Sequence, residues 1–119
     1  MKISVIIPTY QHANTIVNCV ESLLSQTRKP DEIIVIDDGS TDNTENKLSE
    51  FQDKIQYHKQ SNQGSQAARM NGYAKSSGDL LQFCDADLIA RPDMLEKLEI
   101  EVKRAYGVLP EEPKIEAKD

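Results

Sequence analysis

Residues 31–42 read DEIIVIDDGSTD, and the hydrophobic part of this stretch decides the fold class. Its four apolar residues, IIVI, follow one another without a polar interruption and predict a strand over Glu32–Ile36. Val and Ile favour strands, and an unbroken apolar strand is typical of a sheet covered on both faces, as parallel sheets are. A second stretch of this kind, Ile3–Ile7, ends at Pro8. Both segments are therefore expected to be strands of a parallel sheet.

Two more strands and four helices are expected around this pair. The other strands are Ile55–His58 and Asp79–Cys84, and the apolar run of the latter predicts a buried strand. Segments with helical spacing separate all four strands. This alternation predicts an α/β fold, a three-layer sandwich with a mostly parallel central sheet and right-handed crossovers.

The first helix is predicted from its apolar spacing, and the others are predicted from their ends. Apolar residues at i, i+4, i+7 and i+8 indicate an amphipathic helix over about residues 14–26. Asp42 with Glu45 resembles a capping box that opens a helix to about Phe51. Ser65–Lys75 is rich in alanine, and Pro92 suits the first position of the last helix. The apolar stripe behind Pro92 consists of Met94, Leu95, Leu98 and Val102.

We expect one domain, residues 1–106, followed by a charged tail. A chain of 119 residues is long enough for one hydrophobic core. Residues 107–119, GVLPEEPKIEAKD, contain two prolines and no periodic stripe. This composition predicts a flexible tail or the stub of a truncated chain.

The composition argues against several classes of protein. A net charge of -6 makes a nucleic-acid surface improbable, since that requires a basic face. Cys19 and Cys84 form no CxxC pattern, so two free thiols in a reducing cytosol are the simpler interpretation, with one disulfide left open. The sequence shows neither a signal peptide nor an apolar run of about 20 residues. We therefore expect a cytoplasmic protein, and membrane association through a missing region stays open.

Polar residues follow every predicted strand, at the edge where open α/β sheets bind ligands. After the second strand comes DDGSTD, residues 37–42. A turn explains most of it, because Asp-Gly supplies a residue with positive φ and Asp42 caps a helix. The turn leaves Asp37 unexplained. A carboxylate there could accept hydrogen bonds from a ribose hydroxyl or a base.

The sequence Asp85-Ala86-Asp87 follows the fourth strand and is the candidate metal site. Two neighbouring carboxylates repel each other and lose hydration unless a cation joins them. Mn²⁺ or Mg²⁺ prefers oxygen ligands and completes its shell with water and substrate phosphates. The alternative is a solvated turn in which one aspartate caps the next helix. Neither GxGxxG nor GxxxxGK[ST] occurs, so a diphosphate would need other ligands.

Arg69 is the candidate phosphate ligand. It is the one basic residue in NQGSQAARMNG, residues 62–72, and lies one turn into the helix predicted to begin at Ser65. There it could pair with a phosphate or with the acids of the neighbouring loop, and an ordinary surface arginine is the alternative. His12 and His58 are predicted to lie far apart, which argues against a zinc site.

Four ordered segments resemble the nucleotide-sugar half of the family 2 glycosyltransferases. That resemblance implies the GT-A fold, whose nucleotide-binding half is Rossmann-like. The match covers residues 2–98, most of the chain, and four motifs in order are far more specific than a DxD motif alone. The segments are SVIIPTYQHANTIVNCVESLLSQT at 4–27, DEIIVIDDGSTDNT at 31–44, NQGSQAARMNG at 62–72 and GDLLQFCDADLIARPDMLEKL at 78–98.

The resemblance implies that the first two strand ends bind the nucleoside. Pro8, Thr9 and Tyr10 would line the base pocket. Asp38, with Asp37 as a second candidate, would contact the base or the ribose. The chain departs mildly from the family pattern after Tyr10, where Gln11 stands in place of the more usual Asn.

The later segments would hold the diphosphate and the sugar. Gly64 would allow close backbone approach, and Arg69 would help to hold the pyrophosphate. Asp85 and Asp87 would be the DxD pair, with Asp87 as the better metal ligand and Asp85 facing the donor. Ala86 between them would also line the donor site.

The function implied is transfer of a sugar from a nucleoside-diphosphate donor, most simply a UDP-sugar, to a carbohydrate or lipid-linked acceptor. Such transfer uses Mn²⁺ or Mg²⁺, usually inverts the anomeric centre and serves polysaccharide biosynthesis. Family members continue well beyond the matched region, where they carry the acceptor site and the catalytic base. No base is therefore assigned, and the chain by itself is expected not to transfer sugar.

Three alternatives concern the function and the assembly. A nucleotide-binding module without turnover would keep the donor cleft alone. A nucleotidyltransferase is disfavoured, because its glycine-rich, lysine-containing N-terminal loop is missing. An uncovered edge strand would favour pairing with another copy of the chain.

Overall fold

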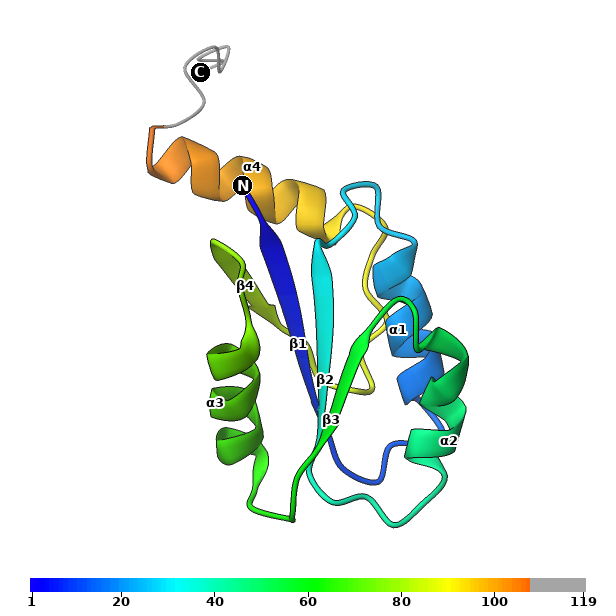
Figure 1. Cartoon of the computed structure of the whole chain (residues 1–119). Helices are drawn as coiled ribbons and strands as arrows, with labels where there is room; N and C mark the ends of the chain where they lie inside the picture. The colour runs from blue at the N-terminus through cyan, green and yellow to red at the C-terminus, as the bar shows by residue number, and fades with distance from the viewer. Residues whose placement is uncertain (108–119) are drawn as a thin grey trace.

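The computed structural model describes residues 1–107, and its centre is a four-stranded parallel sheet (Figure 1). The strand order is β3-β2-β1-β4, so the two most hydrophobic strands lie in the middle. All three strand pairs are parallel. The strands are β1 (Ile3–Thr9), β2 (Glu32–Asp37), β3 (Gln56–Lys59) and β4 (Leu80–Phe83).

Helices lie on both faces of the sheet, which confirms the predicted α/β fold with three layers. Helix α1 (Ile16–Leu24), α2 (Thr44–Leu48) and the short 3-10 helix η1 (Ser49–Phe51) cover one face. Helix α3 (Ser65–Lys75) covers the other, and α4 (Met94–Ala105) lies beside the amino end of β1 (Figure 1). The predicted tail lies outside the described residues, apart from Gly107. No described helix is both long and apolar enough to cross a bilayer.

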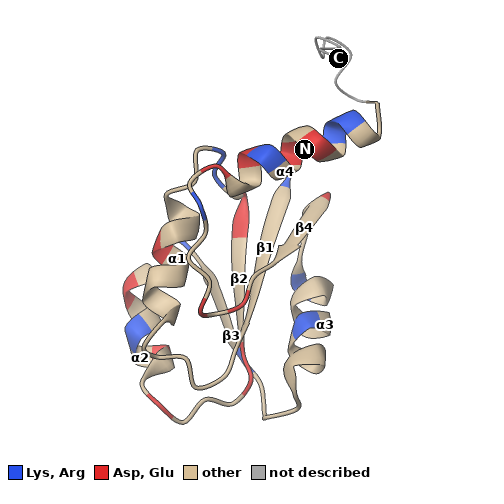
Figure 2. Cartoon of the chain, turned by 180° about the vertical axis from the view of Figure 1, so that it is seen from behind, with Lys and Arg blue, Asp and Glu red and all other residues tan. Residues whose placement is uncertain are grey.

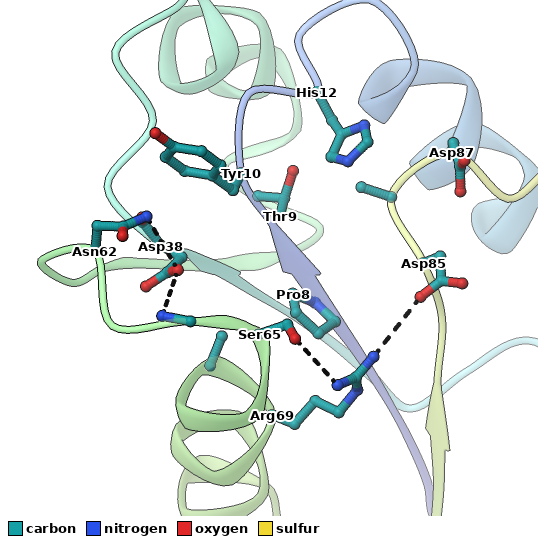
Figure 3. A pocket seen from close by; sticks show the side chains of 13 residues that line it. Pro8, Thr9, Tyr10, His12, Asp38, Asn62, Ser65, Arg69, Asp85 and Asp87 are labelled. Carbon is teal, nitrogen blue, oxygen red and sulfur yellow. Dashed lines mark hydrogen bonds and ion pairs between the residues drawn. The ribbon is translucent and has the colours of Figure 1, made fainter.

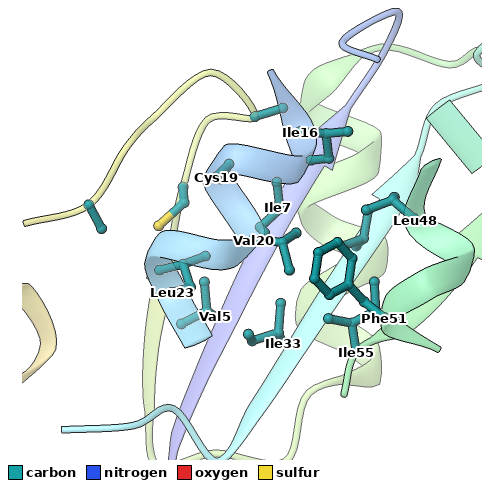
Figure 4. Close-up of a cluster of buried hydrophobic side chains, with 14 of the residues drawn as sticks. Val5, Ile7, Ile16, Cys19, Val20, Leu23, Ile33, Leu48, Phe51 and Ile55 are labelled. Carbon is teal, nitrogen blue, oxygen red and sulfur yellow. The ribbon is translucent and has the colours of Figure 1, made fainter. Parts of the chain in front are cut away.

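The core side chains of β1 and β2 point alternately to the two faces of the sheet, because successive side chains of a strand lie on opposite sides. Side chains of one parity, including Val5, Ile7 and Ile33, meet the apolar stripe of α1 (Figure 4). Side chains of the other parity, Ile34 and Ile36, pack on α3. Each of these buried aliphatic side chains stabilises the fold by about 1.5–3 kcal/mol. The α1 stripe consists of Ile16, Val20 and Leu23 with Cys19.

Helix α3 lies unusually close to the sheet at Gly72. A Cβ atom at this position would lie 2.4 Å from Cγ2 of Ile6 on β1. That distance is far below van der Waals contact, so glycine is required for the helix to pack here. The close packing sets the distance between α3 and the sheet.

The prediction that the fourth strand is buried was wrong. β4 is an edge strand that pairs only with β1 among the described residues, and its side chains are half-buried or exposed. Phe83 is 40% exposed. An apolar run of four residues does not distinguish a central strand from an edge strand, because hydrophobicity does not record how many neighbours a strand has.

The predicted capping box was also wrong. Helix α2 begins at Thr44 with Asn43 as its N-cap and no side-chain cap bond. The Asp42 carboxylate instead accepts hydrogen bonds from the Thr44 N–H at 3.1 Å and from its hydroxyl at 2.6 Å, which is a local Asx turn. Glu45 pairs with Lys59 of β3 at 3.6 Å instead of reaching back to the cap.

The last helix begins later than predicted. Its first residue is Met94 and its N-cap is Asp93, so Pro92 lies in the preceding turn. The carbonyl of Pro92 accepts a hydrogen bond from the Thr27 N–H at 2.9 Å. This contact ties the turn before α4 to the end of α1.

Candidate functional site

The loops that follow the strands meet around a single cleft with a volume of about 420 Å³ (Figure 3). This size falls within the range of small-ligand sites. The carboxyl ends of parallel strands share one edge of the sheet, so residues from distant parts of the sequence converge there. The lining residues are Pro8, Thr9, Tyr10, His12, Asp38, Asn62, Gly64, Ser65, Ala68, Arg69, Asp85, Ala86 and Asp87.

The end of β1 supplies Pro8, Thr9 and Tyr10 to the cleft wall, where the sequence placed them. Thr9 is only 2% exposed, and its Oγ1 has no hydrogen-bond partner among the described residues. A buried hydroxyl without a partner is costly unless a ligand or water completes it. The Tyr10 ring is 46% exposed, so its face is accessible to a planar group.

Asp38 is buried in the wall beside Tyr10 and gathers four donors from the loop between β3 and α3. Its Oδ1 accepts the Gln63 N–H at 2.7 Å and the Gln60 amide at 2.9 Å. Its Oδ2 accepts the Gly64 N–H at 2.9 Å and the Asn62 amide at 3.3 Å. Burial acts to raise the pKa of Asp38, but these hydrogen bonds outweigh it and hold the pKa below its ordinary value.

Asp37 does not line the cleft, which differs from the expectation that it contacts a ligand. Its side chain is fully buried. One oxygen accepts the Ser40 N–H at 2.9 Å and the other accepts the Tyr57 hydroxyl. Burial, reinforced by this bond, raises the pKa of Tyr57. The Asp37 carboxylate therefore stabilises the turn after β2 from inside the fold. This structural role accounts for an acid at the end of a hydrophobic strand, and no ligand is required.

Gly64 and Arg69 bring α3 to the cleft. Gly64 is the N-cap of α3 and has φ +101°, a conformation that residues with a Cβ rarely adopt. Arg69 lies one turn further on, 3.5 Å from the Ser65 hydroxyl and 4.0 Å from Asp85 (Figure 3). The guanidinium thus lies across the cleft from the loop that follows β4.

Asp85, Ala86 and Asp87 alternate in exposure. Both acids are exposed and line the cleft, whereas Ala86 is 2% exposed and belongs to the hydrophobic core. The methyl group of Ala86 anchors the loop, and both carboxylates face outward. A ligand could therefore reach Ala86 chiefly through its backbone.

The pair of acids suits a cation whose shell is completed by a ligand rather than by the protein. Within residues 1–107, no group of three or more His, Cys, Asp or Glu side chains is placed to hold a metal. No described residue donates a hydrogen bond to the carboxylate of Asp87. Mg²⁺ and Mn²⁺ bind in this manner, through one or two carboxylates together with phosphates and water.

Residues of opposite charge come from α3 and from the loop between β4 and α4, and Arg69 is the basic residue of α3 that lines the cleft. Figure 2 shows basic positions on α3 and acidic positions in the loop between β4 and α4. The Arg69 guanidinium lies 4.0 Å from the Asp85 carboxylate, so these two charges form an ion pair at the cleft.

Four lining residues were missed by the sequence analysis: His12, Asn62, Ser65 and Ala68. Asn62 and Ser65 lie in a segment already singled out by its position after a strand. His12 follows Gln11, whose φ of +59° turns the chain sharply after β1. Only this backbone turn directs His12 toward the cleft, and nothing in the residue pattern indicates it.

The sequence profile described as glycosyl transferase family 2 matches residues 4–111, and the cleft lies within this match. The chain belongs to glycosyl transferase family 2. This confirms the family that the four motifs resembled. The family assignment also accounts for the parallel sheet whose carboxyl edge carries the cleft.

Relatives of this chain are named glycosyltransferases. The uncharacterized glycosyltransferase alr2836 of Nostoc sp. (strain PCC 7120) is 39% identical over 113 residues, which are 92% of this chain and 35% of that protein. Glycosyltransferase GlyA of Streptococcus pneumoniae serotype 4 is 39% identical over 100 residues, 82% of this chain and 14% of that protein. The chain thus spans about a third or less of the length of these relatives.

Two solved structures share the fold of this chain. S. aureus TarS 1-349 superimposes with a TM-score of 0.80 at 26% identity, over 89% of this chain and 33% of that one. Glucosyl-3-phosphoglycerate synthase of Mycobacterium tuberculosis in complex with UDP superimposes with a TM-score of 0.65 at 30% identity, over 74% and 34% of the two chains.

Proposed function

We propose that the cleft binds a nucleoside-diphosphate sugar, specifically a UDP-sugar, together with Mn²⁺ or Mg²⁺, as the donor site of a glycosyltransferase. The observation that carries the proposal is the position of Arg69, 4.0 Å from Asp85 across a cleft that Asp87 also lines. A cationic group and an acid pair that face each other in this way suit a diphosphate with a divalent cation. S. aureus TarS 1-349 has been crystallised with UDP-GlcNAc, and the mycobacterial synthase with Mn²⁺ and UDP.

In this proposal the β1 end binds the nucleoside, and Asp38 shapes the pocket around it. The Tyr10 ring stacks on the base, and Pro8 forms the wall beneath it. The unpartnered Thr9 hydroxyl donates to or accepts from the nucleoside. Asp38 shapes the base pocket chiefly by holding the loop at Gly64 close, because its oxygens are already occupied by four donors.

Arg69, Asp85 and Asp87 hold the diphosphate and the sugar. Arg69 neutralises phosphate oxygens, and the backbone at Gly64 lies at the amino end of α3, where anions are favoured. Asp87 is the principal metal ligand, and Asp85 faces the ribose or the sugar. A divalent cation at Asp87 would stabilise the negative charge that develops on the departing nucleoside diphosphate.

The acceptor hydroxyl attacks the anomeric carbon as the bond to the diphosphate breaks, and its proton passes to a general base. We propose inversion of the anomeric centre by this single displacement, which analysis of the product anomer tests. The base is not assigned to any residue of this chain. A carbohydrate or lipid-linked acceptor is the proposed partner.

Calorimetry tests the donor site directly. UDP should bind about tenfold or more tightly with Mn²⁺ than without it, which corresponds to about 1.4 kcal/mol. The variant Asp87→Ala should remove this difference. Asp53→Ala, which makes the same change of charge at an exposed position outside the cleft, should retain it. Binding of UDP that responds neither to the metal nor to Asp87→Ala would overturn the proposed metal site.

A further inference from the structure

A column of small polar side chains runs along one side of α1 and past both of its ends. Its members are Thr15, Cys19, Ser22 and Gln26, at positions i, i+4, i+7 and i+11. This spacing keeps them on one side of a helix. All four contact the backbone of residues 85–95, the segment that carries the two acids of the cleft.

The first two members hold the backbone of the acid pair itself. The Thr15 hydroxyl donates to the carbonyl of Ala86 at 3.1 Å, and the Cys19 thiol donates to the carbonyl of Asp85 at 3.5 Å. Thr15 is the N-cap of α1, yet it makes no side-chain cap bond. A threonine at this position normally accepts from a helix N–H, so its hydroxyl is engaged by the loop in place of its own helix.

The last two members hold the segment beyond the acids. The Ser22 hydroxyl accepts the Ala90 N–H at 2.9 Å. The Gln26 amide donates to the carbonyl of Arg91 at 2.6 Å and accepts the Leu95 N–H at 2.9 Å. Gln26 is only 1% exposed, so this amide is a buried polar group with both of its ends engaged.

Residues 85–93 belong to no strand or helix, so other groups must satisfy their backbone. The column on α1 supplies those groups on the side away from the cleft. Residues 85–88 form a turn closed by the Leu88 N–H, which donates to the carbonyl of Asp85 at 3.0 Å, and the buried Ala86 marks the inner side of this turn. The acids on either side of Ala86 therefore face the cleft because α1 holds the intervening backbone.

We infer that this polar column is a positioning device for the metal-binding loop, in which Thr15, Cys19, Ser22 and Gln26 set where Asp85 and Asp87 lie. The inference rests on the proposed function for its effect on ligand binding. Within residues 1–107 the Asp87 carboxylate accepts no hydrogen bond, so its position depends on the backbone beneath it. A shift of that backbone moves the carboxylate away from the cation.

Thr15→Val removes the hydroxyl and preserves the branched shape of the side chain, and Thr15→Ser restores the hydroxyl. Ser4→Ala is the control, since Ser4 is a buried hydroxyl on β1 that bonds Glu32, away from the cleft. Two readouts are compared in all variants. One is hydrogen–deuterium exchange of residues 84–90 in the ligand-free chain, and the other is UDP affinity with and without Mn²⁺.

Thr15→Val should speed exchange of residues 84–90 and should reduce the Mn²⁺-dependent gain in UDP affinity by about tenfold, with metal-free affinity unchanged. Thr15→Ser should restore both, and Ser4→Ala should alter neither. Exchange and metal response that are unchanged in Thr15→Val would overturn the inference. If the wild-type chain binds UDP without regard to Mn²⁺, the proposed metal site fails, and the exchange comparison alone decides whether the column holds the loop.

Discussion

Replacing Asp38 with asparagine is expected to lower the free energy of unfolding by about 3 kcal/mol. Four donors converge on its two carboxylate oxygens, at distances between 2.7 and 3.3 Å. In asparagine one oxygen becomes an NH₂ group, which faces two of these donors and can accept from neither. A hydrogen bond to a charged group contributes about 1.5–3 kcal/mol, so the loss of two costs at least about 3 kcal/mol.

The lower end of this range is the better expectation, because the amide can turn its NH₂ group toward the oxygen position with the longer bond. That position includes Asn62 at 3.3 Å, whose own side chain can rotate away. Urea denaturation at pH 7 measures the change, with Asp53→Asn as the control. Asp53 is exposed, and its substitution should change the free energy by less than about 0.5 kcal/mol.

The pH dependence gives a second measurement of the same carboxylate. Its pKa in the folded chain lies below the ordinary value of 3.8, so its contribution is complete above that value and is lost as the pH falls through the lowered pKa. The stability difference between wild type and Asp38→Asn should stay constant from pH 7 to about pH 5 and shrink below about pH 4. A loss under about 1 kcal/mol at pH 7, or a difference that grows in acid, would refute the description of Asp38 as a carboxylate enclosed by donors.

Three further predictions concern the core, the two thiols and the edge of the sheet. Ala86→Leu should overpack the core and lower the free energy of unfolding by about 1–3 kcal/mol, measured by thermal melts. Ile89→Leu, at an exposed position, should leave the stability unchanged. Equal melting temperatures of the two variants would contradict the buried position of Ala86. Burial raises the pKa of the Cys19 and Cys84 thiols to about 12 and about 11, so both should react slowly with a thiol reagent at pH 8 and rapidly in urea; fast reaction of the folded chain would refute their burial. Self-association through the β4 edge should raise the mass measured by light scattering at high concentration, and Phe83→Lys should suppress it; a constant monomer mass would exclude this contact.

The sequence was sufficient to predict the sheet because β1 and β2 each contain four Val or Ile residues in nearly unbroken runs. Hydrophobic strands of this kind have few alternatives, and the polar residues after them had to share the carboxyl edge. The prediction failed where an interaction depends on neighbours in space. Phe83 belongs to an edge strand, and Asp42 caps its own turn instead of a helix. Neither fact is contained in the local pattern.

The same distinction between local sequence patterns and contacts in space applies to the site. Arg69 and the two acids after β4 could be selected because charge at a strand end is conspicuous. Asp37 was as conspicuous, but its oxygens are occupied from within the fold. The polar column on α1 was invisible, because Thr15 and Gln26 have partners about 65 to 71 residues away, and those partners are backbone atoms. Every residue has a backbone carbonyl, so the sequence does not indicate which carbonyl accepts such a hydrogen bond.

Asp85, Ala86 and Asp87 are adjacent in the sequence but are subject to two different constraints. Ligand binding constrains the two acids, and core packing constrains Ala86. Because both acids are exposed, they can be exchanged with little effect on folding. The residue between them is held to a small side chain by the core, whatever the ligand is. Such a loop can change its chemistry through single substitutions at the acids, and no second mutation is needed to restore stability.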